Sequence, residues 1–219
     1  MPMLAPLTAL TLAVAGFALG WWPLAAWSAH SITGERMPRR TTLRIAAAVT
    51  TAATFGLLGL RFGLDWLLPA LLAFAACATV LSIVDLVEKR LPNAVVFPAL
   101  AAVAVLLVPA TWATGEWMRL VWALAGAAAM FAVYFVLALI SPSSMGMGDV
   151  KLALVIGLLT GWFGLSPWFV ALLAAFVIGG LISLVALTLK RVTLRGSIPF
   201  GPSMLAGALV AVLFAGPVG

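Results

Sequence analysis

The chain has 219 residues, of which 65% are hydrophobic and only 8% are charged, and its mean hydropathy is +1.23. This composition excludes a water-soluble globular domain, in which about 25% of residues are charged, and it predicts an integral membrane protein. The net charge of +6 comes without a long basic run or room for a soluble binding domain, so we expect no nucleic-acid partner.

Eight largely apolar runs follow one another along the chain, and most approach the ~20 residues that a membrane-spanning helix needs. We therefore predict an all-α polytopic bundle of about eight transmembrane helices, forming a single membrane-embedded domain over residues 1–219. The first basic residue is Arg36, so the apolar start lacks the basic region of a cleaved secretory signal. The predicted helices cover residues 5–29, 43–62, 66–88, 93–112, 117–140, 149–163, 167–189 and 199–217.

Basic residues are concentrated in alternate links between these helices. The other links contain only Arg61 and Arg119 among the twelve Lys and Arg residues. Cytoplasmic loops are enriched in Lys and Arg, so we predict a multi-pass protein of the cell inner (plasma) membrane, surrounded by lipid, with both chain ends outside. The ten residues in or beside the first, third, fifth and seventh links are Arg36, Arg39, Arg40, Arg44, Lys89, Arg90, Lys151, Lys190, Arg191 and Arg195.

Histidine and cysteine are too scarce to build the commonest metal sites. Cys77 lies within an apolar run, where we expect it to pack, and His30 is the only histidine. A zinc-binding HExxH pair is therefore excluded, and we expect no metal and no cofactor. Gly157 and Gly161 form a GxxxG spacing, which is typical of close helix packing.

Two of the six acidic residues stand out because ionisable groups in or beside a membrane-spanning segment are costly and mark functional sites. Asp85 precedes the basic pair at the end of the third predicted helix, and Asp149 begins the sixth, 64 positions later. Both are predicted at the cytoplasmic surface. The other four acids have structural explanations in links, in turns or beside basic residues: Glu35, Asp65, Glu88 and Glu116.

A pair of carboxyl groups can hydrolyse a peptide bond when one is ionised to activate water and the other is protonated. Two carboxyl groups that share a site favour this asymmetry, because both cannot ionise cheaply. Gly146 and Gly148 precede Asp149, and we expect them to permit unusual backbone angles and close approach of an extended peptide. The alternative is that each aspartate forms a structural ion pair, Asp85 with Lys89 or Arg90 and Asp149 with Lys151.

Three segments in order, VDLVEKRLPN at 84–93, GMGDVKL at 146–152 and IPFGP at 198–202, resemble the type IV prepilin peptidase family of GxGD aspartic proteases. The similarity extends from about the third helix to the C-terminus. It implies an eight-helix membrane fold in which Asp85 and Asp149 are the catalytic pair at the cytoplasmic face.

The resemblance also implies roles for the neighbours of the second aspartate. Gly146 and Gly148 would shape its loop, and Lys151 would either tune Asp149 or face lipid headgroups. The proline and glycine residues of IPFGP would be architectural. No metal is implied.

The implied substrates are prepilins or pseudopilins, which carry a short basic leader before an apolar helix. Longer family members have a cysteine-bearing cytoplasmic domain in the first link and also N-methylate the new terminus. Here that link is short and has no cysteine, which puts methyltransferase activity in doubt.

Three other classes of membrane protein remain possible from the sequence. A Ser/Lys protease could use Ser143 or Ser144 with Lys151, and a presenilin-like protease would explain the PAL triplet at 98–100, although that triplet should follow the second aspartate. An ion- or proton-coupled small transporter, or a membrane assembly subunit, would also contain intramembrane acids. A conduction path favours ionisable groups near the midplane, and the polar residues that we expect there are not ionisable.

Overall fold

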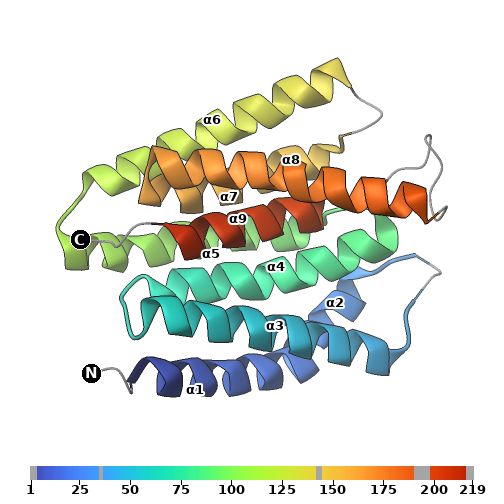
Figure 1. Ribbon diagram of the computed structural model, residues 1–219, viewed down its shortest axis with the longest axis horizontal. Helices are drawn as coiled ribbons and strands as arrows, with labels where there is room; N and C mark the ends of the chain where they lie inside the picture. The colour runs from blue at the N-terminus through green and yellow to red at the C-terminus, as the bar shows by residue number, and fades with distance from the viewer. Residues whose placement is uncertain (1–3, 35–36, 142–144, 190–197, 216–219) are drawn as a thin grey trace. The chain divides into compact units, whose positions relative to one another are not determined.

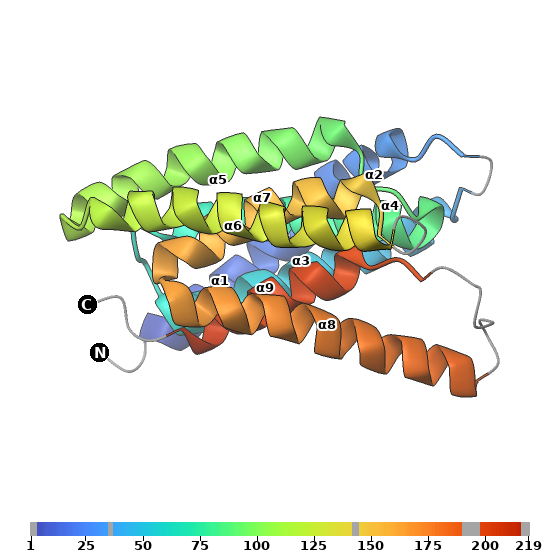
Figure 2. The ribbon, with the colours of Figure 1, turned by 90° about the horizontal axis from the view of Figure 1, so that it is seen from above.

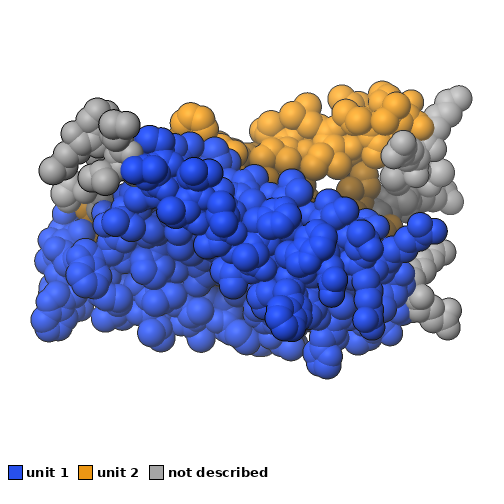
Figure 3. All heavy atoms as spheres, turned by 90° about the horizontal axis from the view of Figure 1, so that it is seen from below, with its two compact units in different colours: residues 1–88, 92–117 blue, residues 89–91, 118–219 orange. Residues whose placement is uncertain are grey.

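The computed structural model describes residues 4–34, 37–141, 145–189 and 198–215, and every regular element within these residues is helical. Their helices confirm the predicted all-α fold (Figure 1). The chain divides into two compact units, residues 1–88 with 92–117 and residues 89–91 with 118–219, which Figure 3 colours separately. The single peptidase domain stays a prediction.

The first unit contains one long interrupted helix and three further helices. α1 packs closely on α3 because Gly16 and Gly20 bring the two backbones together: a Cβ on Gly16 would lie 2.7 Å from the Thr51 carbonyl oxygen. Pro23 lies inside the π-helical turn η1, and such a turn accommodates a residue that lacks a backbone N–H. The elements are α1 (Leu4–Leu19), η1 (Gly20–Leu24), α2 (Ala25–Ser31), α3 (Arg40–Phe62), α4 (Leu68–Glu88) and α5 (Asn93–Thr114).

The second unit consists of α6 (Met118–Ile140), α7 (Met147–Phe163), α8 (Leu165–Thr188) and α9 (Gly201–Phe214). α6 packs along α7, and α8 runs beside α9 (Figure 1 and Figure 2). Only Gly164 separates α7 from α8, and its φ of 112° is a backbone conformation that side chains with a Cβ rarely adopt.

Small residues form the contact between α6 and α7. A Cβ on Gly126 would lie 2.6 Å from the Gly157 carbonyl oxygen, and one on Gly161 would lie 2.6 Å from the Trp122 carbonyl oxygen. The indole of Trp168 donates a hydrogen bond of 2.9 Å to the Gly126 carbonyl. The predicted role of the GxxxG spacing in close helix packing is therefore confirmed.

Six helical spans in the described chain are long and apolar enough to cross a membrane, the first of them running through α1, η1 and α2, whereas α7 has 17 residues and α9 has 14. On α8, Leu173, Val177 and Leu181 recur every fourth residue and are each about 60% exposed. Such exposed apolar stripes suit a lipid environment. Cys77 is buried within α4, as expected for a packing residue.

Candidate active site

The N-cap and the first five residues of α7 include four of the five residues that the sequence singled out. Gly146 is the N-cap, and its N–H donates a hydrogen bond of 3.2 Å to Oδ2 of Asp149 three residues later. A carboxylate in the first turn also interacts favourably with the positive end of the helix dipole. Asp149 and Lys151 are both partly exposed. The turn therefore fixes the backbone that presents the Asp149 carboxyl group.

Gly148 is needed for packing and not for an unusual backbone angle. A Cβ on Gly148 would lie 3.0 Å from Cβ of Leu91 and 3.3 Å from its backbone nitrogen. The described glycines with positive φ are all elsewhere, and Gly146 has an extended φ of −79° and ψ of 150° that any residue adopts. The expected backbone freedom is thus wrong for this pair. The expected close approach applies to Gly148, but toward the chain's own Leu91.

Asp85 lies in the first unit, in the last turn of α4, and is only 4% exposed. It is the only described carboxylate among the buried residues of its helix. Burial of a carboxyl group at a helix end is costly unless it has partners or a function. The structure therefore agrees with the sequence in setting Asp85 apart from the exposed acids.

Glu88 has a role that the sequence did not reveal. Its Oε1 accepts a hydrogen bond of 2.6 Å from the Thr33 N–H and a second from the Gly34 N–H. These bonds tie the link after α2 to the end of α4. The sequence interpretation considered only the neighbours Lys89 and Arg90, because a partner 54 positions away leaves no local signal.

We expect Glu88→Ala to loosen this link, because the Thr33 and Gly34 amides lose their acceptor. Their hydrogen exchange should accelerate by at least about tenfold. Mass spectrometry of peptides that cover residues 32–40 measures this change. Glu116→Ala removes an equal charge from an exposed turn and should leave the exchange unchanged. Equal protection in Glu88→Ala and the wild type would contradict the tie.

An aromatic cluster supports the start of α9. Tyr134, which is 1% exposed, stacks on Phe176 with ring centroids 5.8 Å apart, and Phe176 lies 5.4 Å from Phe200. Phe200 belongs to the IPFGP segment, which agrees with the expected architectural role of that segment. Sequence reasoning missed Tyr134, although it is the only tyrosine in the chain.

Other predicted features fall outside this site or outside the described residues. Ser143 and Ser144 are among the latter. The PAL triplet at 98–100 lies within α5. No cluster of three or more His, Cys, Asp or Glu residues occurs in the described part of the chain.

The sequence of the chain matches the model of one known protein family. The type IV leader peptidase family matches residues 72–184, a range that includes both Asp85 and Asp149. The chain belongs to this family. The match also includes the segment at 84–93 and the GxGD segment, whereas IPFGP lies beyond its end.

The relatives carry the name prepilin leader peptidase/N-methyltransferase. The chain is 31% identical to the one from Bacillus subtilis over 77% of this chain and 65% of the relative. It is 28% identical to that of Stutzerimonas stutzeri over 73% and 54%, and 31% identical to that of Burkholderia pseudomallei over 84% and 56%. The chain thus spans just over half to about two thirds of these relatives. No solved structure matches it.

Proposed function

We propose that the protein is an intramembrane aspartic endopeptidase, with Asp85 and Asp149 as its catalytic pair. Its substrates are prepilins or pseudopilins, as the names of the relatives suggest. Gly146 and Gly148 shape the start of α7. Lys151 lies two residues after Asp149. No metal or cofactor takes part in the proposed reaction.

The packing of Gly148 on Leu91 is the observation that carries this proposal. Leu91 follows α4 after only two intervening residues, and Asp85 is one turn before the end of α4. One helical turn and three extended residues span about 15 Å at most, so the covalent chain limits the distance between the Asp85 and Leu91 Cα atoms. The Leu91 side of this contact is therefore joined to Asp85 by only a short stretch of chain, which supports the proposal that the two aspartates act together.

The chemistry needs one ionised and one protonated carboxyl group. The ionised member takes a proton from water while the water oxygen bonds to the scissile carbonyl carbon. The protonated member donates a hydrogen bond to the carbonyl oxygen, and the C–N bond breaks as a proton passes to the leaving amine. The two macroscopic titrations belong to the pair rather than to either residue.

The proposed orientation follows from the charges in the links. The ten basic residues counted above favour a cytoplasmic active site in the inner membrane with both chain ends outside. A basic leader would then remain in the cytoplasm while its apolar helix lies among lipids. The sequence of the first link, residues 32–39, contains no cysteine, so the proposal covers cleavage without N-methylation.

Purified protein incubated with a prepilin tests the proposal directly. We expect one cut between the basic leader and the apolar helix, measured by mass spectrometry of the two products. A substrate with the leader arginines and lysines replaced by glutamine should be cut more slowly, because acidic residues near the site attract the basic leader. The proposed peptidase function would be contradicted if an active relative cut the same prepilin and this protein did not. It would also be contradicted if the protein carried protons across vesicle membranes and did not cut the prepilin.

Gly148→Ala should lower the cleavage rate by roughly tenfold to a hundredfold, because small displacements of catalytic groups have effects of that size. The added Cβ must displace Leu91 or the start of α7. Gly146→Ala is the matched control, since its Cβ would lie 3.5 Å from Oδ2 of Asp149, an ordinary contact. Initial rates on one prepilin compare the two. A larger loss in Gly146→Ala would contradict the packing argument.

A further inference from the structure

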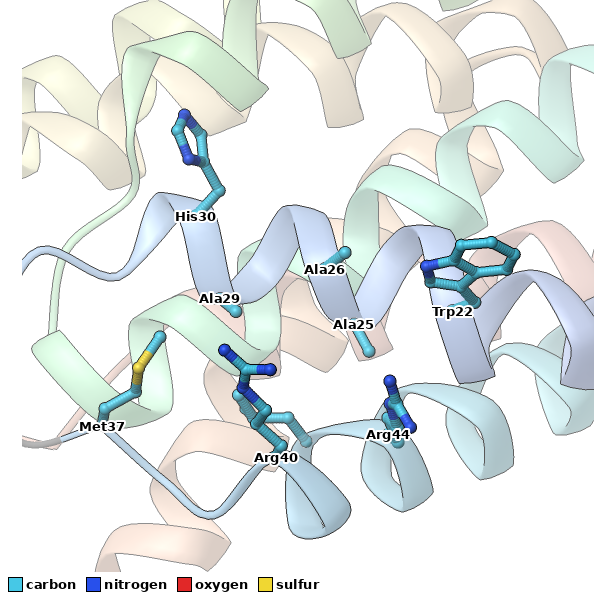
Figure 4. Close-up of a pocket in the computed structure, with 9 residues that line it drawn as sticks. Trp22, Ala25, Ala26, Ala29, His30, Met37, Arg40 and Arg44 are labelled. Carbon is cyan, nitrogen blue, oxygen red and sulfur yellow. The ribbon is translucent and has the colours of Figure 1, made fainter.

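A basic pocket in the first unit is lined by neither of the proposed catalytic residues. It is a cavity of about 440 Å³ between the η1–α2 segment and the start of α3 (Figure 4). Small side chains on α2 leave room there, and Arg40 and Arg44 point from α3 toward them, whereas the His30 ring is directed away. The pocket is lined by Trp22, Ala25, Ala26, Ala29, His30, Met37, Arg40, Leu43 and Arg44.

The charge in this pocket has one sign. Arg40 and Arg44 are four residues apart, so they lie on one face of α3, and two like charges at that spacing repel each other. None of the nine described lining residues is acidic. Arg44 also lies over the Trp21 ring, with its guanidinium carbon 5.9 Å from the ring centroid. An anion between the two guanidinium groups would relieve the repulsion.

Guanidinium groups match phosphate in geometry as well as charge. Each presents several N–H donors in a planar fork, which suits bidentate bonds to phosphate oxygens. Arg40 is also the first residue of α3, where unpaired backbone N–H groups add positive potential. A basic leader peptide is repelled by the same charges. The pocket therefore favours a phosphate-bearing ligand.

The surroundings of the pocket have the polarity of a membrane interface. Trp21 and Trp22 are exposed beside it, and tryptophan is enriched at the level of lipid headgroups. Farther along α3, Ile45 and Val49 are 50% and 56% exposed. A ligand with a phosphate in the pocket and acyl chains along the helices would match both parts of this surface. Apolar surface continues on α1 at Phe17.

We propose that this pocket binds the phosphate of an anionic phospholipid headgroup, with Arg40 and Arg44 as its ligands. Two other pockets, at Trp66 and Trp112 and at Trp122 and Trp168, have no charged lining residue in the described chain. They therefore lack the groups for this chemistry. Free inorganic phosphate shares the recognised group and is the alternative source that the experiment separates.

The experiment titrates the purified full chain in detergent with phosphatidylglycerol or phosphatidylcholine and counts bound lipid by native mass spectrometry. The wild type should bind phosphatidylglycerol at least about tenfold more tightly. The double variant Arg40→Gln/Arg44→Gln should lose at least about tenfold in that affinity, as expected for charge-assisted hydrogen bonds. Arg39→Gln is the matched control, because Arg39 is exposed but does not line the pocket.

A second variant keeps the test decisive if the double arginine variant fails to fold. Ala26→Leu fills the cavity and keeps both arginines, so it should also weaken phosphatidylglycerol binding, with melting temperatures measured for all variants. Inorganic phosphate that raises the wild-type melting temperature and displaces the lipid would assign the pocket to the free anion. An equal loss in Arg39→Gln, equal binding of the two lipids, or preference for a polyglutamate peptide would overturn the proposal.

Discussion

Asp149→Asn and Asp85→Asn should each reduce prepilin cleavage by at least about a thousandfold, because each removes one of the two acid–base groups. Asparagine is similar in size to aspartate but cannot exchange a proton at neutral pH. At position 149, its amide oxygen can still accept the hydrogen bond from the Gly146 N–H. The loss should therefore affect chemistry and not the start of α7. Cleavage is measured by the gel shift of a co-expressed prepilin.

Asp65→Asn is the matched control for these variants. Asp65 lies in an exposed turn, where its Oδ1 accepts a hydrogen bond of 2.7 Å from the Leu67 N–H, which an amide oxygen can also accept. We expect nearly full cleavage. Membrane insertion and melting temperature should match the wild type in all three variants. Processing retained in either Asp85→Asn or Asp149→Asn would contradict the two-aspartate mechanism.

Gly161→Leu should destabilise the second unit strongly. Even its Cβ would lie 2.6 Å from the Trp122 carbonyl oxygen and 3.1 Å from the Gly126 Cα. Backbone atoms cannot move aside as a flexible side chain can, so α6 and α7 must separate. Overpacking costs about 1–3 kcal/mol in typical cores, and we expect at least the upper end here. Thermal unfolding in detergent measures the loss.

Gly180→Leu provides the comparison for this helix contact. Gly180 lies within α8, and a Cβ there would have no atom within 4 Å. The same increase in volume should therefore leave the melting temperature almost unchanged. A similar fall in both variants would show that loss of glycine alone, and not the α6–α7 contact, causes the effect.

Helix positions were well predicted because apolar run length determines which segments can cross a bilayer. The predicted helix at 93–112 is observed as Asn93–Thr114, and that at 117–140 as Met118–Ile140. The π-helical turn at Gly20–Leu24 was not predicted. Hydropathy averages over a window and does not register how each backbone N–H is paired.

Contacts between residues that are far apart in the sequence were the hardest features of the structure to predict. The GxxxG spacing correctly indicated a close helix contact, but nothing in it identified Gly126 as the partner. The basic pair after Asp85 likewise indicated a membrane surface. The hydrogen bond from the Gly34 N–H to Glu88, however, depends on how α2 and α4 pack, which the sequence does not show. The roles of Asp85 and Asp149 stay predictions that the proposed variants test.

The tie between Glu88 and the amides of Thr33 and Gly34 bears on how this family varies in length. The sequence resemblance implies that longer members carry an extra domain in this first link. Because the hydrogen bonds end at Gly34, the chain between this residue and Arg40 can lengthen without loosening α2 from α4. We therefore expect a reporter domain grafted between Gly34 and Arg40 to leave both hydrogen bonds to Glu88 in place.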